Sequence, residues 1–376
     1  MVGQMKILVT GAGGFIGKNF IWTAKAHDDM EILAYHHGMD DEALKKMCMV
    51  CDAVVHLAGV NRPKDEQEFS CGNVDFTKKL ISFLNHRDGS CPIIFSSSTQ
   101  AMLDNPYGIS KTEAEDVIRK YGETHGGETY IYRLPNVFGK WCRPNYNSVV
   151  ATFCHNIARD LPITVNDEAK EINLVYIDDV VNAFIDVLIG KKKPIKDSNG
   201  FCSVPVTYKS TVGKIAKLIC GFRDCRKNIA VPDMDDELTK KLYSTYLSYL
   251  PEDGFSYELI SHEDSRGSFT EFMRTMGQGQ FSVNVSRPHI VKGGHWHRSK
   301  HEKFLVVHGS GVIRLRHIAS DEILSYAVSD KKLEVVEIPP GYTHEIENTG
   351  DTDMVTLMWA NENFDPENPD TYRMEV

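Results

Sequence analysis

The sequence has no long uninterrupted hydrophobic run. The stretch from Val180 to Gly190 is broken by Asn182 and Asp186, whereas a helix needs roughly 20 apolar residues to cross a bilayer. The chain also lacks a basic start followed by an apolar segment, which is the pattern of a secretory signal. These absences predict a cytoplasmic protein that is neither secreted nor inserted in a membrane.

An excess of positive charge is absent as well. Lys and Arg number 42 against 52 Asp and Glu, which gives a formal net charge of −10. This balance argues against nucleic acid as the main partner. The 28 Gly and 15 Pro among 376 residues are close to average usage, which excludes low-complexity and collagen-like chains. A chain of this length is expected to form two domains, each with its own core.

Cysteine is absent after Cys225, although the chain holds nine cysteines in total. Eight of the fifteen histidines, in contrast, lie after residue 250. This difference in composition predicts two domains, residues 1–250 and residues 251–376. An odd number of cysteines without regular spacing is typical of a reducing compartment and of buried thiols. The pair Cys48 and Cys51 has no second pair to complete a metal site, so we expect no metal or redox role for it.

The first of these segments alternates short apolar runs with helical stretches. Such alternation predicts a parallel sheet with helices on both faces and a nucleotide at the carboxyl ends of the strands. The expected fold class is therefore α/β, a Rossmann-type doubly wound parallel sheet. The strand-like runs cover residues 5–10, 31–35, 53–57, 92–96 and 129–133, and one helical stretch covers residues 111–120.

Glycines follow the first apolar run at Gly11, Gly14 and Gly17. At a turn from a strand to a helix, backbone amides and the helix N-terminus can hold a pyrophosphate. The spacing is G-x-x-G-x-x-G rather than G-x-G-x-x-G, and a tight turn without a ligand is the alternative. The second run ends near His36, where no acidic residue precedes Asp40 to hydrogen-bond a ribose 2′-hydroxyl. Because that carboxylate is missing, we expect NADP rather than NAD.

The reactive side chains of this segment are those of residues 96–99 (SSST), Tyr107 and Lys111. Tyr and Lys four residues apart share one face of a helix. A lysine ammonium beside a phenol lowers the pKa of the phenol, and such a tyrosine can act as general acid when hydride adds to a ketone. A serine hydroxyl at a strand end can hold the carbonyl oxygen in place. The alternative is that Tyr107 is one amphipathic residue among 15 tyrosines.

Residues 5–245 resemble the extended short-chain dehydrogenases/reductases, and among these the members that act on nucleotide sugars. The resemblance is carried by TGAGGFIG at residues 10–17, HLAG at residues 56–59, the serine cluster, and Tyr107 with Lys111. It implies that Ser98 is the catalytic serine, with Ser97 and Thr99 as rivals, and that Tyr107 and Lys111 complete the catalytic group. It also implies a cofactor site formed by Gly11, Gly14, Phe15, Ile16, Gly17, His36, Leu57, Ala58, Gly59, Tyr107 and Lys111.

Later landmarks of the same family imply a substrate site. Asn136 lies in RLPNVFG at residues 133–139, and Arg143 and Asn147 lie in WCRPNYN at residues 141–147. Enzymes of this kind hold a nucleotide diphosphate at the second of these segments. Arg143 could pair with a phosphate, and an exposed structural arginine is the alternative.

The second segment changes to short alternating runs separated by turns. The helical pattern ends between Thr239 and Gly254, and strand-like runs follow at residues 280–285, 303–307, 312–317, 333–338 and 354–359. Evenly spaced short strands predict a closed or double-layered β-structure.

Four residues of this β-segment are candidate metal ligands. His295 and His297 are two residues apart, so on a strand both side chains point to the same face. Glu302 and His344 could complete a site of three nitrogens and one oxygen that stays open to water or substrate. This ligand set suits zinc best, with iron, nickel and manganese as alternatives.

The two motifs around these ligands resemble those of the metal-binding cupins, H-x-H-x(4)-E-x(6)-G and P-x-G-x-x-H-x-x-x-N. The resemblance implies a cupin double-stranded β-barrel, or jelly roll, that holds zinc or another divalent metal. The glycines that often open the two motifs are replaced by His289 and Leu333. Lys300, His301 and Tyr342 are candidate bases for a proton transfer near the metal, and His301 is also a possible substitute ligand.

A nucleotide-sugar reductase joined to a metal-binding cupin resembles the CapF-type enzymes of capsular polysaccharide synthesis, over nearly the whole chain. The resemblance implies a homodimer that acts on a UDP-activated 4-keto amino sugar, on the route to UDP-N-acetyl-L-fucosamine. The cupin would epimerise UDP-2-acetamido-2,6-dideoxy-4-hexulose at C3, and NADPH would then reduce C4 to give UDP-2-acetamido-2,6-dideoxy-L-talose. Two alternatives are a single-step reductase or 4,6-dehydratase with a structural, dimerising cupin, and a sugar-binding or regulatory protein without catalysis.

Overall fold

The structure, a computed structural model, describes residues 4–63, 65–277 and 279–376 of the chain. Its contacts divide the chain into two compact units, Met1–Ile219 with Lys241–Leu250, and Cys220–Lys240 with Pro251–Val376. The segment Cys220–Lys240, which the sequence places in the first domain, therefore clusters with the second unit. The reason is a long-range pairing, because strand β11 (Ala230–Val231) lies parallel to strand β13 (Gly267–Thr275).

The first unit is built on a seven-stranded sheet with the order β2-β1-β3-β4-β5-β9-β8. All neighbouring strands are parallel except β8 and β9, so the expected doubly wound parallel sheet is confirmed. The strands read as apolar runs because a parallel sheet is covered on both faces. Their bounds are β1 Met5–Thr10, β2 Met30–Tyr35, β3 Ala53–His56, β4 Ile93–Ser98, β5 Thr129–Leu134, β8 Ile195–Lys196 and β9 Cys202–Ser203.

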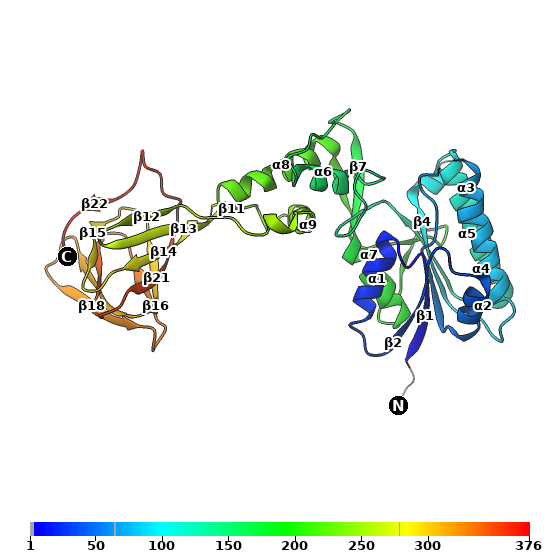
Figure 1. The fold of residues 1–376 in the computed structure, drawn as a ribbon, viewed down its shortest axis with the longest axis horizontal. Coiled ribbons are helices and arrows are strands. Elements are labelled where there is room, and N and C mark those ends of the chain that lie inside the picture. Colours follow the sequence, from blue (N-terminus) through cyan, green and yellow to red (C-terminus); the bar gives the residue numbers. More distant parts are fainter. Residues whose placement is uncertain (1–3, 64, 278) are drawn as a thin grey trace. The chain divides into compact units, whose positions relative to one another are not determined.

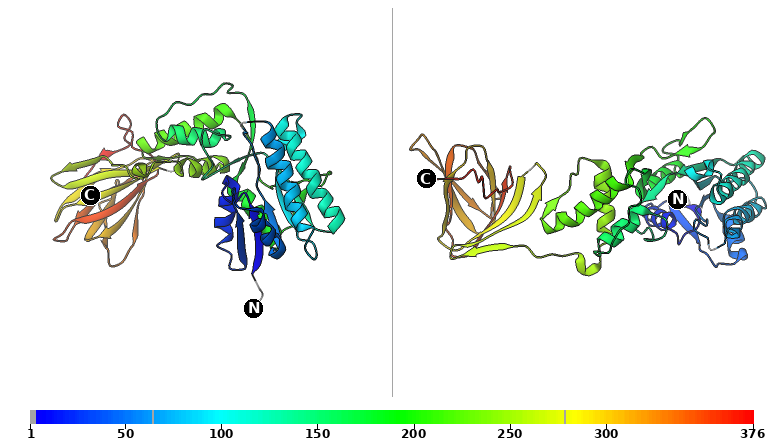
Figure 2. Two further views of the ribbon diagram at one scale, coloured as in Figure 1. Left: turned by 45° about the vertical axis from the view of Figure 1, so that its right-hand side comes forward. Right: turned by 90° about the horizontal axis from the view of Figure 1, so that it is seen from above.

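Helices cover both faces of this sheet (Figures 1 and 2). Helices α1 (Phe15–Ala24) and α7 (Ile177–Leu188) lie on one face, over a core that includes Phe20 and Phe184. Helices α2 (Asp41–Val50), α4 (Phe76–Leu84) and α5 (Pro106–His125) lie on the other face, over a second core. In the described part of the chain, no helix is both long and apolar enough to cross a membrane.

Helix α5 has capping residues at both of its ends. The side chain of Asn105 accepts a hydrogen bond from Gly108 N, Pro106 occupies the first turn, and Gly126 ends the helix with φ of 68°. These are the residue types that favour a helix start and a helix end. The cap therefore places Tyr107 in the first turn and Lys111 one turn further on, at the carboxyl end of β4.

The remaining elements of the chain before residue 255 lie outside the seven-stranded sheet. A small sheet has the order β10-β7-β6, with β6 Asn136–Phe138, β7 Glu171–Tyr176 and β10 Tyr208–Thr211. The other elements are helix α3 (Gln67–Phe69), the π-helical turn η1 (Ser70–Asp75), the 3₁₀ turns η2 (Thr99–Met102) and η3 (Glu252–Gly254), and helices α6 (Val149–Ile157), α8 (Val212–Lys227) and α9 (Glu237–Leu247).

The second unit consists of two sheets, and the expected β-structure is confirmed. One sheet has the order β11-β13-β14-β21-β16-β19, with β12 beside β13, and the other has the order β18-β17-β20-β15-β22. Phe304 and Val336 of the first sheet and Ile313 and Ile346 of the second contribute to one shared core. The remaining bounds are β12 Ser261–Asp264, β14 Gly279–Ser286, β15 Val291–Trp296, β16 Glu302–His308, β17 Ser310–His317, β18 Ile323–Ser329, β19 Val335–Ile338, β20 Tyr342–Asn348, β21 Met354–Ala360 and β22 Tyr372–Arg373.

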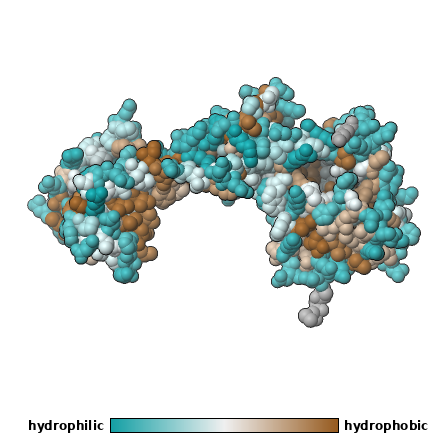
Figure 3. Space-filling model, viewed as in Figure 1, coloured by the Kyte–Doolittle hydropathy of each residue, from teal (hydrophilic) through white to brown (hydrophobic). Residues whose placement is uncertain are grey.

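The outer face of the first of these two sheets is apolar. Figure 3 shows apolar side chains gathered over β14, β21 and β16. The strand register places Val283, Leu357, Leu305 and Val335 in one row. Leu305 follows the buried Phe304, and successive side chains of a strand point to opposite faces. The row therefore lies on the face away from the core.

Candidate functional site

The glycine turn joins β1 to α1 and depends on two close contacts. Gly11 has φ of +68°, and a Cβ on Gly11 would lie 2.7 Å from the nitrogen of Ala58. A Cβ on Gly17 would lie 2.3 Å from the carbonyl oxygen of Gly11. Only glycine fits at both positions. These two glycines shape the turn. A cleft of about 650 Å³ is lined by the next residues of the turn, Gly14, Phe15 and Ile16. The N-terminus of α1 presents backbone amides to this cleft.

The end of β2 carries His36 beside this turn. A Cβ on Gly13 would lie 3.5 Å from Nδ1 of His36. The first acidic side chain after β2, that of Asp40, accepts a hydrogen bond from Ala43 N at 2.7 Å and caps α2. That carboxylate is therefore engaged in the helix cap.

The end of β3 is fixed by a buried histidine. His56 Nδ1 lies 2.7 Å from Thr10 Oγ1, and His56 Nε2 lies 2.9 Å from Thr77 Oγ1. Burial, with a contribution from the charge of Lys111, lowers the pKa of His56 to about 3, so the ring is neutral and ties β1, β3 and α4 together. Leu57 and Ala58 follow, and their backbone N–H groups donate to Thr10 Oγ1 at 3.2 and 3.3 Å.

Gly59 makes room for the lysine of α5. A Cβ on Gly59 would lie 2.9 Å from Asn73 Oδ1 and 3.2 Å from Lys111 Nζ. Leu57 and Gly59 line the same cleft as Tyr107 and Lys111. The HLAG motif thus lies where the glycine turn and the reactive side chains meet.

The three serines of β4 have different partners. Ser97 donates to Glu115 Oε1 at 2.5 Å, and Glu115 forms a buried ion pair with Arg133 at 2.6 Å. Ser98 accepts from Gln100 N at 3.2 Å, lies near enough to the Tyr107 phenol to lower its pKa, and lines the cleft. Because side chains alternate along a strand, Ser98 is the serine beside Tyr107, and Ser97 belongs to the support behind it. Ser97 and Thr99, the two rivals of Ser98, also line the cleft.

The different partners of Ser97 and Ser98 predict that one alanine substitution lowers stability and the other lowers the rate of reduction. Ser97→Ala removes a donor from a buried carboxylate, and we expect the free energy of unfolding to fall by about 1–3 kcal/mol. Ser98→Ala is expected to leave stability nearly unchanged and to lower the rate of ketone reduction by roughly 10²-fold, as for loss of one donor to a developing oxyanion. Urea denaturation and NADPH consumption measure the two effects. The reverse pattern would make Ser97 the reactive serine.

Tyr107 and Lys111 face the cleft without direct contact between their polar atoms. Lys111 Nζ donates to the carbonyl oxygen of Ser96 at 3.1 Å and lies 6.0 Å from the centre of the Tyr107 ring. Burial lowers the pKa of Lys111 to about 8, against the opposing charge of Glu115. Burial raises the pKa of Tyr107, against the hydrogen bond with Ser98. The expected lowering of the Tyr107 pKa is therefore not found, because the ammonium points to Ser96 and desolvation dominates. The phenol stays protonated at neutral pH, as a proton donor must be.

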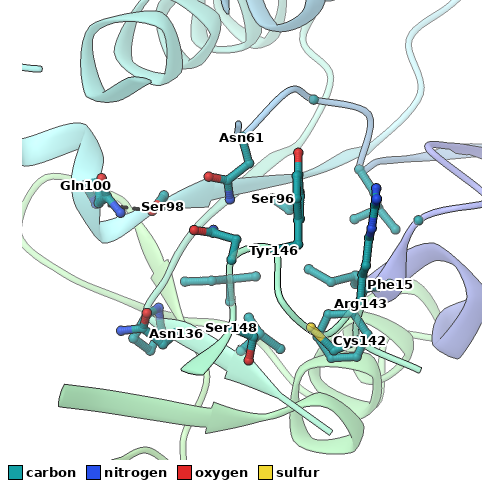
Figure 4. Close-up of a pocket in the computed structure, with 18 of the residues that line it drawn as sticks. Phe15, Asn61, Ser96, Ser98, Gln100, Asn136, Cys142, Arg143, Tyr146 and Ser148 are labelled. Carbon is teal, nitrogen blue, oxygen red and sulfur yellow. Dashed lines mark hydrogen bonds between the residues drawn. The ribbon is translucent and has the colours of Figure 1, made fainter. Parts of the chain in front are cut away.

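The expected substrate residues lie around the same cleft. Asn136, Arg143 and Asn147 all line it, and the Arg143 guanidinium lies 5.1 Å from the centre of the Tyr146 ring. Figure 4 shows how side chains from several elements surround this cavity, among them Phe15, Asn61, Ser98, Asn136, Arg143 and Tyr146. Asn61 and Tyr146 were missed by sequence reasoning, although each lies in or next to a recognised motif.

The loop that carries Arg143 is held in an unusual conformation. Trp141 has φ of 68° and Asn145 has φ of 53°, values that are uncommon for residues other than glycine. Tyr249 donates to the carbonyl oxygen of Cys142 at 2.5 Å, and Arg62 N donates to Tyr146 Oη at 3.3 Å. These contacts fix the loop, as expected where strain is kept at a binding site.

The four candidate metal ligands of the second unit converge. One possible ligand atom from each of His295, His297, Glu302 and His344 lies within 4.8 Å of the other three. Glu302 Oε2 lies 3.4 Å from His297 Nε2 and 3.3 Å from His344 Nε2. The histidines come from β15, the turn after it and β20, and the carboxylate comes from the first residue of β16.

The donor atoms of this cluster fit a cation. In the described part of the chain, the buried atoms His297 Nε2, Glu302 Oε2 and His344 Nε2 have no hydrogen-bond partner. Burial and the charges of His344 and His297 lower the pKa of His295 to about 4, so that imidazole is neutral. Burial raises the pKa of Glu302, but the contacts with His297 and His344 outweigh it and hold the pKa well below its usual range. An anion with a neutral imidazole is the protonation state that metal binding requires.

The cluster lies in a cavity of about 500 Å³ in the second unit. Of the three candidate bases, Lys300 lines this cavity. His301 packs edge-on against Trp359, with ring centres 5.4 Å apart, and Tyr342 packs against His317 at 5.1 Å. The sequence reasoning missed other lining residues, among them Phe269, Asn284 and Lys292. Phe269 lies two residues after the segment DSRG at residues 264–267, which lines the same cavity, whereas no neighbouring motif marks Asn284 or Lys292.

A doubly wound sheet with this glycine turn, and with Ser98 beside Tyr107, defines the class of protein. The model of the NAD dependent epimerase/dehydratase family matches residues 7–195, about half of the chain, and the chain belongs to this family. A second model, named Polysaccharide biosynthesis C-terminal domain, matches residues 262–372.

Two relatives extend over nearly the full length. The chain is 45% identical over 373 residues to UDP-2-acetamido-2,6-beta-L-arabino-hexul-4-ose reductase of Pseudomonas aeruginosa, with 99% of each chain covered. Its fold matches the crystal structure of the capsular polysaccharide assembling protein CapF from Staphylococcus aureus with a TM-score of 0.93 and 50% identity, covering 99% of this chain and 100% of that one. The chain is therefore a CapF-like capsular polysaccharide biosynthesis protein.

A more distant structure shows the fold alone. It is the UDP-glucuronic acid 4-epimerase of Bacillus cereus in complex with NAD, with a TM-score of 0.54 and 20% identity. The match covers 65% of this chain and 96% of the epimerase.

Proposed function

We propose that this chain is a bifunctional enzyme of nucleotide-sugar metabolism. The C-terminal unit, a metal-binding cupin, epimerises UDP-2-acetamido-2,6-dideoxy-4-hexulose at C3. The N-terminal unit then reduces C4 to give UDP-2-acetamido-2,6-dideoxy-L-talose, on the route to UDP-N-acetyl-L-fucosamine for capsular polysaccharide. The supporting observation is that one chain carries both a Ser98–Tyr107 pair in a cleft and a separate cluster of four metal-ligand residues, and is 45% identical to a nucleotide-sugar reductase.

The reduction is assigned to the cleft of the first unit. Bound NADPH supplies the hydride that adds to C4. The residues of the glycine turn would hold its pyrophosphate, and His36 would accommodate a 2′-phosphate, since the Asp40 carboxylate is engaged in the cap of α2. Ser98 holds the C4 oxygen and Tyr107 donates a proton to it, while Lys111 contributes positive charge beneath the site. Arg143 binds a phosphate of the UDP group, and Asn136 and Asn147 supply polar contacts.

The epimerisation is assigned to the cavity of the second unit. The 4-keto group acidifies the proton on C3, so epimerisation must precede the reduction that removes the ketone. A divalent cation, zinc by preference, would supply Lewis-acid stabilisation of negative charge on the substrate oxygen when bound. The residues that would hold that cation are His295, His297, Glu302 and His344, and Phe269 and Phe304 supply apolar surface to the cavity that they line. The homodimer implied by the resemblance is part of the same proposal, and sedimentation equilibrium measures it.

The decisive experiment separates the two steps. The 4-keto substrate is incubated with the enzyme in D₂O without NADPH and followed by proton NMR. We expect the C3 proton signal to disappear faster than in a sample without enzyme, and the C4 proton of the product to appear only after NADPH is added. If the C3 proton persists while NADPH is consumed, the protein is a single-step reductase and the C-terminal unit is structural.

A further inference from the structure

The C-terminal segment of the chain returns to the candidate metal cluster. Strand β22 pairs with β15, with Arg373 opposite His295 and Tyr372 opposite Trp296. The rings of Trp296 and Tyr372 are stacked, with their centres 4.9 Å apart. Residues that lie nearly 80 positions away in the sequence are therefore paired with β15 beside the candidate ligand His295.

Asp370 makes the contacts that matter most in this segment. Its carbonyl oxygen accepts a hydrogen bond from His297 Nδ1 at 2.6 Å. Its carboxylate accepts from the backbone N–H groups of Arg298, Ser299 and Lys300 at 3.0, 2.9 and 2.9 Å, and from the Ser299 hydroxyl at 3.1 Å. One residue thus holds both the ring of His297 and the backbone that follows it.

The hydrogen bond to the carbonyl oxygen selects one tautomer of the neutral imidazole. A carbonyl oxygen can only accept, so Nδ1 carries the hydrogen, and in a neutral imidazole Nε2 then presents a lone pair. That Nε2 is the buried atom without a hydrogen-bond partner in the described part of the chain, 3.4 Å from Glu302 Oε2. Partners of this kind orient a metal-binding histidine and raise its basicity.

The backbone of Asp370 adopts a conformation that costs free energy. Its φ is 42°, in the left-handed region that Asp enters only at some expense. The four hydrogen bonds to its carboxylate compensate for that expense. The same segment also holds Lys300, whose Nζ donates to the carbonyl oxygen of Pro369 at 3.0 Å and to Thr371 Oγ1 at 3.2 Å.

We propose that Asp370 is a positioning residue for the metal site: its carboxylate holds the turn after His297, so that its carbonyl oxygen keeps His297 Nε2 directed at the cation. This inference rests on the proposed metal site. Loss of an outer partner of a metal ligand typically weakens metal binding by about 10–100-fold. We therefore expect Asp370→Ala to weaken zinc binding by about that factor.

The test uses metal-free full-length protein titrated with zinc against a chromophoric chelator. Asp365→Ala is the matched control, because Asp365 lies in the same C-terminal segment and its carboxylate accepts only from Glu367 N at 3.0 Å among its described contacts. Asp370→Asn tolerates the left-handed conformation and keeps one acceptor oxygen, so it should recover part of the affinity. Cobalt-substituted samples give a second readout, since a rotated His297 changes the visible absorption bands of the bound ion.

The outcomes are distinct. Weaker zinc binding and an altered cobalt spectrum in Asp370→Ala, with partial recovery in Asp370→Asn and none of these changes in Asp365→Ala, support the inference. Wild-type affinity and spectrum in Asp370→Ala overturn it and leave the metal site standing. If the wild-type protein itself binds zinc no better than His344→Ala, the proposed metal site fails and the inference fails with it.

Discussion

Replacing Tyr107 with phenylalanine is expected to abolish reduction of the 4-keto sugar while C3 proton exchange continues. Tyr107 lines the cleft beside Ser98, and burial raises its pKa, so that the phenol is protonated at neutral pH. Tyr107→Phe removes the only atom of this side chain that can donate a proton and leaves the ring in place. Since a positioned general acid typically contributes 10²–10⁴-fold, we expect NADPH consumption to fall by about that factor.

The matched control for this variant is Tyr130→Phe. Tyr130 lies in the same unit, on β5, and its hydroxyl donates to Glu128 at 2.5 Å near the surface. It should reduce the ketone at the wild-type rate. Reduction at the wild-type rate by Tyr107→Phe would exclude Tyr107 as the general acid. Loss of reduction with retained C3 exchange would exclude the alternative that the chain is a binding or regulatory protein without catalytic activity.

The fold of the first unit could be predicted because the sequence patterns that specify its strands and turns lie within short segments of the chain. The run at residues 5–10 becomes β1 with the same bounds, and the glycine turn follows it as expected. The boundary between units was less predictable. Cys220–Lys240 clusters with the second unit because β11 pairs with β13, some forty residues further on, and no local pattern announces such a pairing.

The site could be predicted in composition but not in detail. Which of Ser97 and Ser98 stands beside Tyr107 depends on strand alternation, and the predicted strand ends at residue 96, two residues before β4 ends in the structure. The pKa of Tyr107 depends on where the Lys111 ammonium points, which is decided by the carbonyl oxygen of Ser96. The contact of Asp370 with His297 joins residues 73 positions apart, so no motif could contain it.

The other large effect is expected from His344→Ala in the second unit. His344 is buried, and its Nε2 lies 3.3 Å from Glu302 Oε2 without a hydrogen-bond partner among the described residues. Its removal leaves three ligands and breaks the proposed site. A Lewis acid contributes several kcal/mol to enolate formation, and each 1.36 kcal/mol is tenfold in rate. We therefore expect C3 proton exchange to fall on the order of 10³-fold, with bound zinc lost.

The reductase half of the same variant supplies the internal control. A substrate already epimerised at C3 should still be reduced at the wild-type rate, because Ser98 and Tyr107 belong to the other unit.

His308→Ala tests for a general effect of losing a histidine, since His308 is exposed at the end of β16 and lies 3.6 Å from Asp330. If folded His344→Ala has lost its zinc and still exchanges the C3 proton at the wild-type rate, the metal stabilises the β-structure of the second unit, and the chemistry belongs to other residues of the cavity. If C3 exchange and bound zinc are both lost while reduction persists, the ligand cluster is required for epimerisation. One substitution has then removed one activity of the chain and left the other intact.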